Sequence, residues 1–562
     1  MTASTTPPTF SLVDDPWIAC LMMDGSRQVL SLSEVFSRLT EIRGLSGESV
    51  QQDYVVLRVL LVIFWRAQAP KATEGVLSDW WSHLFENVGG DGLVVPVRDY
   101  LAQWKDRFNL FDKAHPFMQV PDLATAKGEP AGVQRLIPEA EQDYFTLRSG
   151  AGREWLSYSE ATRWLIALQA WDYSGIKPGA LGDSRVKGGK GYPIGTGWAG
   201  NTGGVVIHGQ NLGQTLLLNT SLTAVFGDAN GVKEDLPAWE RDPQSASGRA
   251  VEIPEGPCDI LTWQSRCVRL FTDGEKVTGV LVTNGNKIDI REHGFKDPMT
   301  AYRYSKAQTK SNGPNIFFAK SHSEERTLWR GVSAILIQSE TKDSSEGKED
   351  RAPETIQFLS TLRNDEILEG DVVVVELVGF VYGPQSSIIT DSIHEVVPLR
   401  FHTLLSTESE QRGEIVLAAQ KAVSAAIHLG QFAGFLKEAV GGTYEFVPAA
   451  TERVLNLLET EFKDWLLTLE PKETYAQDLD SQSENSPLDR WFATIRAHIT
   501  AEAEILARGA GTKALLGRVE SSDDGGNRSS RILSTATALQ HLNNLLNKTL
   551  KTSTEKTQES HR

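Results

Sequence analysis

Hydrophobic and polar positions follow two different patterns along the chain. Over the first four hundred residues, helix-like stretches such as LRVLLVIFWRAQA mix with short strand-like runs such as VTGVLVTNGNKIDI, GVSAILI and DVVVVELVGFVY. Helical and strand periods therefore share this region without a regular strand-helix-strand repeat. The pattern predicts an α+β fold, with a large irregular N-terminal domain over residues 1–405.

After about residue 408 the pattern predicts helices alone. Apolar side chains recur at spacings of three and four in four segments, which places each set on one helix face. The first segment is 411–438, and the others carry Leu458, Phe462, Trp465 and Leu469; Leu488, Trp491, Ile495 and Ile499; and Ile532, Leu539, Leu542 and Leu546. We predict a C-terminal four-helix bundle over residues 406–550 and a disordered tail over 551–562. The polar stretch 339–354 is also expected to be mobile.

The stretch VVVVELVGFVYGPQSSIITDSIHEVVP predicts a hydrophobic hairpin with a polar tip. Two runs rich in β-branched residues flank a Gly-Pro break, which favours antiparallel strands joined by a short turn. Pro384, Gln385 and Ser386 would then project from a stiff support. From this pattern alone an ordinary solvated turn is the simpler interpretation, because turns are commonly polar.

Composition narrows the function classes. At 562 residues the chain exceeds what a single core usually organises, so at least two domains are expected. The net charge of −17 argues against a surface that coats nucleic acid indiscriminately, so any such site must be a local basic patch. Three cysteines without close spacing favour reduced thiols in the cytoplasm. No secretory signal is expected, and the run YVVLRVLLVIFW is shorter than the ~20 residues that cross a bilayer.

Motifs for catalysis are absent from the sequence. It has no G-x-x-x-x-G-K-[ST] phosphate loop, no H-E-x-x-H metal motif and no G-x-S-x-G nucleophile elbow. The eleven histidines are scattered. We therefore expect no catalytic residue, no metal and no cofactor, with a nuclease built on an irregular metal site as the alternative.

Two stretches are candidates for binding a polyanion. Between positions 296 and 330, tyrosines Tyr302 and Tyr304 are interleaved with basic side chains, which can neutralise phosphates while aromatic rings stack on bases. The basic residues are Lys296, Arg303, Lys306, Lys310, Lys320, Arg326 and Arg330. A solvated basic face is the alternative. The second stretch, SRVKGGKGYPIGTGWAGNTGG, combines Arg185, Lys187 and Lys190 with glycines that allow close approach of the backbone to a ligand.

Several segments, in order, resemble one family over nearly the whole chain. They are FSLVDDPWIACLMMDGSRQVLSLSEVF, AHPFMQV, LSYSEATRWLIALQAWD, TLLLNTSL and the Gln-tipped hairpin that precedes the C-terminal helices. Together they resemble the large subunit (CasA) of type I-E Cascade, the CRISPR RNA-guided surveillance complex. The resemblance implies a noncatalytic subunit that recognises the protospacer-adjacent motif (PAM) in double-stranded DNA and begins strand separation. Its partners would be other Cascade subunits with CRISPR RNA, and a helicase-nuclease recruited for antiviral defence.

The resemblance also implies roles for individual residues. The family's wedge glutamine corresponds to Gln385, flanked by Pro384 and Ser386, and its lysine finger in the PAM minor groove to Lys296, with Lys306 as the second choice. Its glycine loop falls between Pro178 and Gly197, at Gly179 or at Lys187 with Gly188 and Gly189, and its phenylalanine loop, which contacts the PAM region or the guide RNA handle, at Phe145. Arg303, Lys306 and Lys310 would form a basic patch. A pure scaffold subunit without DNA readout remains the other alternative.

Overall fold

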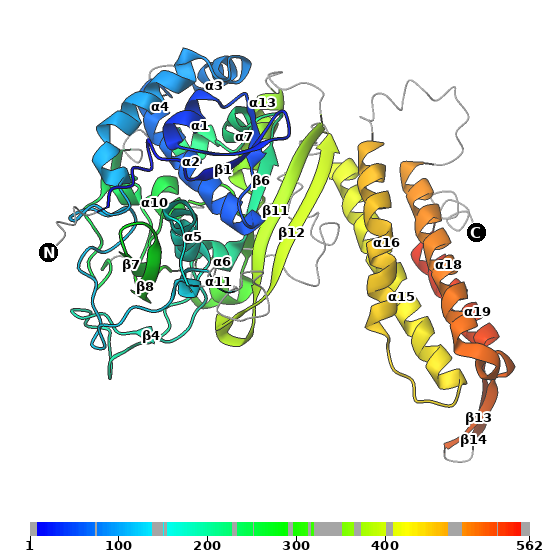
Figure 1. The fold of residues 1–562 in the computed structure, drawn as a ribbon. Coiled ribbons are helices and arrows are strands. Elements are labelled where there is room, and N and C mark those ends of the chain that lie inside the picture. The colour runs from blue at the N-terminus through cyan, green and yellow to red at the C-terminus, as the bar shows by residue number, and fades with distance from the viewer. Residues whose placement is uncertain are drawn as a thin grey trace. The chain divides into compact units, whose positions relative to one another are not determined.

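The computed structural model divides the chain into two compact units. The first comprises Met1–Arg326, Glu340–Glu369 and Val373–Val396, and the second chiefly Val397–Arg562. Each unit is described by itself (Figure 1). The domain boundaries at residues 405 and 550 stay a prediction. The residues described are 8–72, 76–137, 150, 154–227, 233–250, 252–289, 291, 296–312, 316–319, 351–364, 372–400, 409–469, 486–524 and 527–551.

Several of the predictions fall outside these residues. They concern Phe145, the run GVSAILI, the basic residues Lys320, Arg326 and Arg330, positions 339–350 and the tail from 552 onward.

The first unit mixes helices and small sheets, which confirms the predicted fold class. Its α-helices are α1 (Leu32–Ser37), α2 (Val50–Ala72), α3 (Leu77–Glu86), α4 (Asp91–Gln103), α5 (Tyr158–Trp171), α6 (Trp198–Thr202), α7 (Leu212–Leu218), α8 (Leu222–Phe226), α10 (Pro257–Leu261), α11 (Lys306–Asn312) and α13 (Glu354–Asn364). Its 3₁₀ turns are η1 (Lys105–Phe108), η2 (Val133–Leu136), η4 (Ala238–Glu240) and η5 (Pro384–Ser386).

The strands of this unit form small antiparallel sheets. They are β1 (Ile18–Met22), β2 (Arg27–Leu30), β3 (Ile42–Leu45), β4 (Lys177–Pro178), β5 (Lys190–Gly191), β6 (Gly204–His208), β7 (Arg266–Thr272), β8 (Val277–Asn284), β9 (Tyr302–Tyr304), β10 (Phe317–Ala319), β11 (Val372–Tyr382) and β12 (Ile389–Arg400). The predicted hairpin is confirmed as β11 and β12, and β6 completes a sheet of order β12-β11-β6. Val374 pairs with His208 and Val378 with Gly204. Figure 1 shows the two long strands of the hairpin side by side.

Helix α2 is the buried helix predicted from its apolar run. Its residues from Tyr54 to Trp65 are almost wholly buried, because the helix is apolar on every face. Arg58 is buried with them, donates to the carbonyl of Ile260 at 3.3 Å and lies 4.0 Å from Asp297. Within the described part of the chain, no helix is long and apolar enough to cross a membrane.

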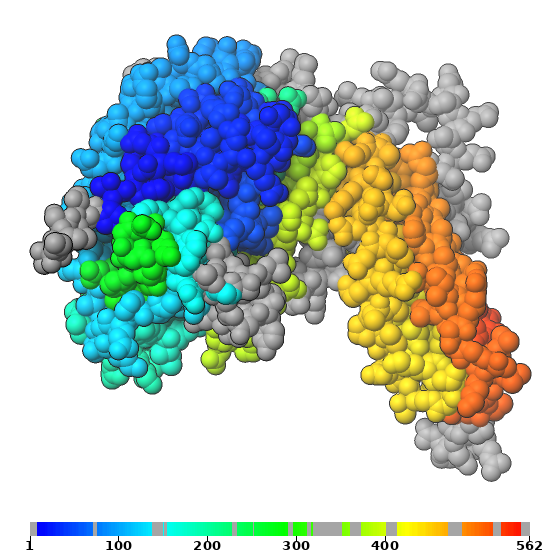
Figure 2. Space-filling view, viewed as in Figure 1, coloured from blue at the N-terminus to red at the C-terminus, as the bar shows by residue number. Residues whose placement is uncertain are grey.

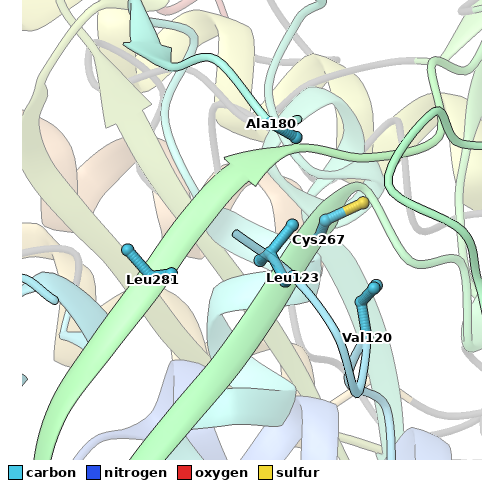
Figure 3. Close-up of a cluster of buried hydrophobic side chains, with 5 residues drawn as sticks. All are labelled: Val120, Leu123, Ala180, Cys267 and Leu281. Carbon is cyan, nitrogen blue, oxygen red and sulfur yellow. The ribbon is translucent and has the colours of Figure 1, made fainter. Parts of the chain in front are cut away.

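Strands β7 and β8 bring distant segments together. Beyond their own pairing, Val280 bridges to Ala131 and Val277 to Leu156. In Figure 2 residues of this hairpin, in bright green, reach the surface among blue and cyan residues from earlier in the chain. A buried cluster lies beneath: Val120, Leu123, Ala180, Cys267 and Leu281 (Figure 3). It fixes the chain just beyond β4 to the β7–β8 hairpin.

All three cysteines are free and buried. Burial raises the pKa of Cys20 to about 12 and that of Cys267 to about 11. Burial also raises the pKa of Cys258 well above its ordinary value. The thiols therefore serve as small apolar packing groups.

The second unit contains the four predicted helices, at α15 (Ser409–Ala439), α16 (Pro448–Leu467), α18 (Pro487–Leu516) and α19 (Thr535–Thr549). Helix α15 packs against the other three, α16 also packs on α18, and α18 on α19. Predicted core residues such as Leu458, Trp491, Ile495 and Leu546 are buried.

The prediction of helices alone after residue 408 is wrong. Strands β13 (Arg518–Asp524) and β14 (Asn527–Leu533) form a hairpin between α18 and α19. Ile532, which we placed on the last helix, lies in β14 opposite Val519 and is 62% exposed. The physical reason is local, because RVESSDD and NRSSRIL carry no apolar stripe at helical spacing.

Candidate nucleic-acid interface

The tip of the β11–β12 hairpin, Pro384–Ser386, is a tight turn with an unusual backbone. Gln385 (φ 58°) and Ser386 (φ 52°) both adopt the left-handed conformation, which residues other than glycine seldom do. The Gly383 N–H donates to the Ile388 carbonyl at 3.0 Å, and the Ser386 N–H to the Gly383 carbonyl at 2.9 Å. Pro384 and Gln385 are exposed. The tip is therefore a closed turn that presents an exposed amide side chain.

Helix α2 braces the hairpin below its tip. The Gln51 amide donates to the carbonyl of Gly379 on β11 and to that of Ile393 on β12, both at 3.2 Å. Trp171, at the end of α5, donates from its indole to the Gln51 carbonyl at 3.0 Å and packs edge-on against Phe380 with ring centroids 5.3 Å apart. Both strands are thus fixed to the helical core, so the tip stands on a stiff support, as the sequence predicts.

Residues 171–177, which we call the linking segment, hold the tip itself. The Tyr382 hydroxyl donates to the Trp171 carbonyl at 2.5 Å. The Ser174 N–H donates to the Ser386 carbonyl at 2.7 Å. The backbone of the linking segment therefore contacts the hairpin twice, at Tyr382 at the end of β11 and at Ser386 in the left-handed turn.

The predicted glycine loop contains a two-residue hairpin turn, residues 187–190, which we call the glycine turn. Lys187 and Lys190 exchange backbone hydrogen bonds of 3.0 and 3.1 Å. Between them, Gly188 (φ 59°) and Gly189 (φ 72°) take the positive φ angles that such a turn requires. All four residues are exposed. This turn presents two lysines and an open backbone to solvent.

Gly179 has a different place. It is buried, and its N–H donates to the Gly189 carbonyl at 2.9 Å. A Cβ there would come within 2.5 Å of Val186. Gly179 therefore shapes the base of the loop, while Gly188 and Gly189 are the glycines open to a ligand.

Lys296 is partly buried and held by the backbone. Its Nζ donates to the carbonyls of Pro254 at 2.6 Å and Glu255 at 2.8 Å. The next residue, Asp297, is buried and accepts from the Trp198 indole at 2.7 Å, which fixes the chain beside the lysine. Entry of Lys296 into a DNA groove would require it to leave both carbonyls.

The basic patch that lies within the described residues is formed by β9 and α11. Arg303 is exposed, with its guanidinium 5.4 Å from the centre of the Phe318 ring. Lys306 and Lys310 are exposed one helical turn apart on α11. These three cations form a local positive surface on an acidic chain.

The expectation that Tyr302 stacks on a base is wrong. Tyr302 is only 3% exposed, and its N–H donates to the Arg351 carbonyl at 2.8 Å. Side chains alternate along a strand, so the exposed Arg303 leaves its neighbour Tyr302 facing inward. Tyr304 is half-buried and packs edge-on against Phe317 at 5.5 Å.

A buried group of charges that sequence reasoning missed surrounds Asp172 of the linking segment. We call it the Asp172 cluster: Asp172, Arg135, Lys177 and Arg266. The fully buried Asp172 carboxylate pairs with Arg135 at 2.9 Å, with Lys177 at 3.0 Å and with the Arg266 guanidinium. These residues are up to 131 positions apart, as Arg135 and Arg266 show, so no local motif marks them.

Burial and the neighbouring charges shift the pKa values of Asp172 and Lys177. Burial opposes ionisation of Asp172, but the charges of Arg135, Lys177 and Arg266 outweigh it and hold its pKa well below the ordinary range. Burial lowers the pKa of Lys177 to about 7, against the attraction of Asp172. Among the residues that the structure describes, no group of three or more His, Cys, Asp or Glu side chains is placed to hold a metal ion.

Comparison with known proteins decides the family. The sequence model of CRISPR-associated protein Cse1 matches residues 11–501, which is most of the chain. The chain belongs to the Cse1 family. This membership confirms the resemblance to the large subunit, CasA, of type I-E Cascade.

Individual relatives agree. This Cse1 chain is 31% identical over 432 residues to CRISPR-associated protein CasA/Cse1 of Thermus thermophilus, covering 75% of this chain and 76% of that protein. It resembles the crystal structure of Thermobifida fusca Cse1 with a TM-score of 0.81 and 31% identity, over 97% of this chain and 98% of that one. A chain in a structure described as a CRISPR RNA-guided surveillance complex has a TM-score of 0.65 at 17% identity, over 96% of this chain and 100% of the other, which shows a shared fold.

Proposed function

We propose that this Cse1 chain recognises a PAM in double-stranded DNA and opens the first base pair beside it with the Gln385 tip. The observation that carries the proposal is the tip itself: an exposed glutamine in a left-handed turn, at the end of a hairpin braced by α2 and α5. Strained backbone persists where the surrounding structure fixes it, and such sites are often functional. A rigid polar wedge is the function that best accounts for this strain.

The wedge has a modest energetic task. Separating one base-pair step costs on the order of 1.4 kcal/mol in stacking, and the guide RNA then replaces the lost pairing. The hairpin needs only to occupy the opened gap, and its amide can hydrogen-bond to the exposed bases or backbone. A flexible loop would lose conformational entropy on insertion, whereas this tip is already ordered by its own hydrogen bonds.

PAM readout would fall to the glycine turn and Lys296. The minor groove is ~6 Å wide and presents a degenerate pattern, so it suits slender side chains and bare backbone. Lys187, Gly188 and Gly189 supply both in the exposed turn. Lys296 would act after release from its two carbonyl acceptors. Arg303, Lys306 and Lys310 would contact phosphates.

The subunit would act within an assembly and without catalysis of its own. Its partners would be the other Cascade subunits with CRISPR RNA, the target duplex and a helicase-nuclease recruited after strand separation, in the cytoplasm. Phe145 would contact the PAM region or the guide RNA handle. Support comes from the family membership and from the absence of catalytic motifs in the sequence. Magnesium-dependent cleavage by the purified chain would contradict the noncatalytic assignment.

The decisive experiment is target binding by the guide-loaded complex that carries Gln385→Ala. We expect about tenfold or greater loss on a closed duplex with a functional PAM, and near-normal binding when the first pairs are already unpaired, because the wedge acts only on paired DNA. Gln103→Ala, which removes an exposed glutamine at the end of α4, is the matched control. Equal binding of the variant and the parent complex to both substrates would instead favour a scaffold subunit whose hairpin tip is an ordinary turn.

A further inference from the structure

The linking segment, residues 171–177, contacts both of the elements proposed to meet DNA. At one end, the Trp171 carbonyl accepts from Tyr382 at the end of β11, and the Ser174 N–H donates to Ser386 of the tip. At the other end, Lys177 starts β4 and lies in register opposite Gly191, the residue that follows the glycine turn. Only five residues, 172–176, therefore lie between Trp171, which contacts the hairpin of the wedge, and Lys177, which pairs beside the glycine turn.

The Asp172 cluster fixes this segment in shape. The Arg266 guanidinium donates to the carbonyls of Tyr173 at 3.0 Å and Gly195 at 2.8 Å, besides its bond to the Asp172 carboxylate. Lys177 Nζ donates to the Tyr173 carbonyl at 3.1 Å and lies 4.2 Å from the centre of the Tyr173 ring. The carboxylate, the backbone carbonyls and the aromatic ring thus share the same cations. Loss of the carboxylate would loosen all of these contacts together.

The glycine turn is anchored on its far side as well. Ala180 belongs to the buried cluster with Cys267 and Leu281 (Figure 3), and the Leu181 N–H donates to the Ala124 carbonyl at 2.9 Å. The turn is therefore held between an apolar anchor and the Asp172 cluster. The linking segment bonds directly to the tip, and α6 also lies against the end of β11, because a Cβ at Gly200 would come within 2.5 Å of the Tyr382 hydroxyl.

We propose that Asp172 is a positioning residue that sets the Gln385 tip and the glycine turn in one fixed relation. The inference rests on the proposed function and deepens it: PAM contact at the glycine turn places the wedge at the adjacent base pair because Asp172 holds the segment between them. Asp172 is buried and touches no DNA. It acts through Lys177 and Arg266 on one side and through Ser174 on the other.

The test uses the guide-loaded complex with Asp172→Asn, Gln385→Ala and the double variant. Each is titrated with a PAM-containing closed duplex and with the same duplex premelted at the first pairs. The control is Glu240→Gln, because the buried Glu240 carboxylate pairs with Arg66 at 2.6 Å and accepts from Tyr100 at 2.6 Å, without contact with the linking segment. Thermal unfolding of each variant measures the general structural effect.

If Asp172 positions the tip, Asp172→Asn loses about tenfold or more on the closed duplex and about twofold or less on the premelted one. The double variant is then no weaker than Gln385→Ala alone, because a displaced wedge and a missing wedge have the same consequence. Equal losses on both substrates, or the same pattern in Glu240→Gln, would show a general structural role and overturn the proposal. Normal behaviour of Asp172→Asn beside an impaired Gln385→Ala would also overturn it and leave the wedge function standing. Normal binding by both Asp172→Asn and Gln385→Ala would contradict the positioning proposal and the wedge function together.

Tyr382→Phe provides the same test if Asp172→Asn does not fold. This change removes one hydroxyl from the contact with the Trp171 carbonyl and leaves the charged cluster intact. A selective loss on the closed duplex that is not additive with Gln385→Ala supports positioning through the linking segment. Unchanged binding on both substrates shows that this contact does not set the tip, and contradicts the proposal.

Discussion

At the scale of single residues, the tip and the Asp172 cluster both contain features that are unfavourable in free energy: left-handed backbone in the tip and a buried charge in the cluster. A left-handed residue other than glycine costs roughly 1–2 kcal/mol, and Gln385 and Ser386 are consecutive. A buried carboxylate is tolerated only when it is paired, and removing one partner of such a pair commonly costs about 3–5 kcal/mol. Ser174, two residues beyond Asp172, donates its N–H to the Ser386 carbonyl, so one hydrogen bond connects the segment that carries Asp172 with the tip.

Asp53, which lies away from the tip, allows a test of how burial of a carboxyl group affects stability at different pH values. Burial raises its pKa to about 7, the charge of Glu376 adds to the rise, and the Gly47 N–H, donating at 2.7 Å, opposes it. Between pH ~4 and ~7 the unfolded chain has lost this proton while the folded chain keeps it, so stability falls as pH rises. Asp53→Asn removes the group that ionises, so this loss of stability disappears. The amide oxygen of the asparagine can still accept the hydrogen bond from the Gly47 N–H.

We therefore expect Asp53→Asn to raise the free energy of unfolding by roughly 1–3 kcal/mol at pH 8 and to change it little at pH 4. Chemical denaturation at both pH values measures the effect. Asp122→Asn, at an exposed aspartate, is the control. A gain at pH 4 as large as that at pH 8 would argue against a proton held by Asp53.

At the scale of elements, periodicity predicted what local sequence encodes. The buried helix α2, the β11–β12 hairpin and the four C-terminal helices carry strong apolar patterns and were predicted from them. Strand β13 was missed because its sequence, RVESSDD, is almost wholly polar and its pairing with β14 supplies the order. The pattern predicted Gln385 at the hairpin tip and the family resemblance supplied its role as a wedge, while its left-handed backbone was not predicted. The Asp172 cluster joins three separate stretches of the chain, at Arg135, at Asp172 with Lys177 and at Arg266, and left no local signal.

The glycine turn makes a prediction at this scale. Replacing both Lys187 and Lys190 by alanine removes two exposed cations and keeps the Gly-Gly turn. If both contact phosphates, the slope of log affinity against log salt falls by about 2, since each contact contributes about 0.9. Titrations of the guide-loaded complex at several salt concentrations measure the slope.

The matched control is Lys113→Ala, at an exposed lysine before the HPFMQ segment. An unchanged slope in the double variant would place the glycine turn away from the DNA backbone. A loss of affinity confined to DNA with a functional PAM, at unchanged slope, would assign these lysines to base readout instead.

At the scale of the whole molecule, the net negative charge disfavours binding of DNA to the surface in general and restricts it to local basic surfaces. The chain has 73 acidic and 56 basic side chains, so its average field repels DNA. Local basic surfaces, such as that of Arg303, Lys306 and Lys310, would have to supply the attraction that the proposed function needs. A PAM-reading subunit benefits from this balance, because weak general attraction limits time spent on DNA without a PAM.

The isolated chain should accordingly bind duplex weakly and with steep salt dependence. Fluorescence anisotropy with a labelled duplex at ~50 and ~200 mM salt measures this, and we expect affinity to fall by about tenfold or more across the range, as for proteins that contact several phosphates. A duplex without a PAM serves as the comparison. Binding that is tight and insensitive to salt would contradict a local basic interface.

The burial of every thiol has a practical consequence for following the tip in motion. Cys20, Cys258 and Cys267 are all buried, and burial raises the pKa of each, so the native fold offers no reactive sulfur to maleimide dyes. A cysteine introduced at the exposed Ser387 would then be the single site of conjugation. A fluorophore there sits two residues from Gln385, so its signal would report in real time when the wedge enters a duplex, without a cysteine-free background.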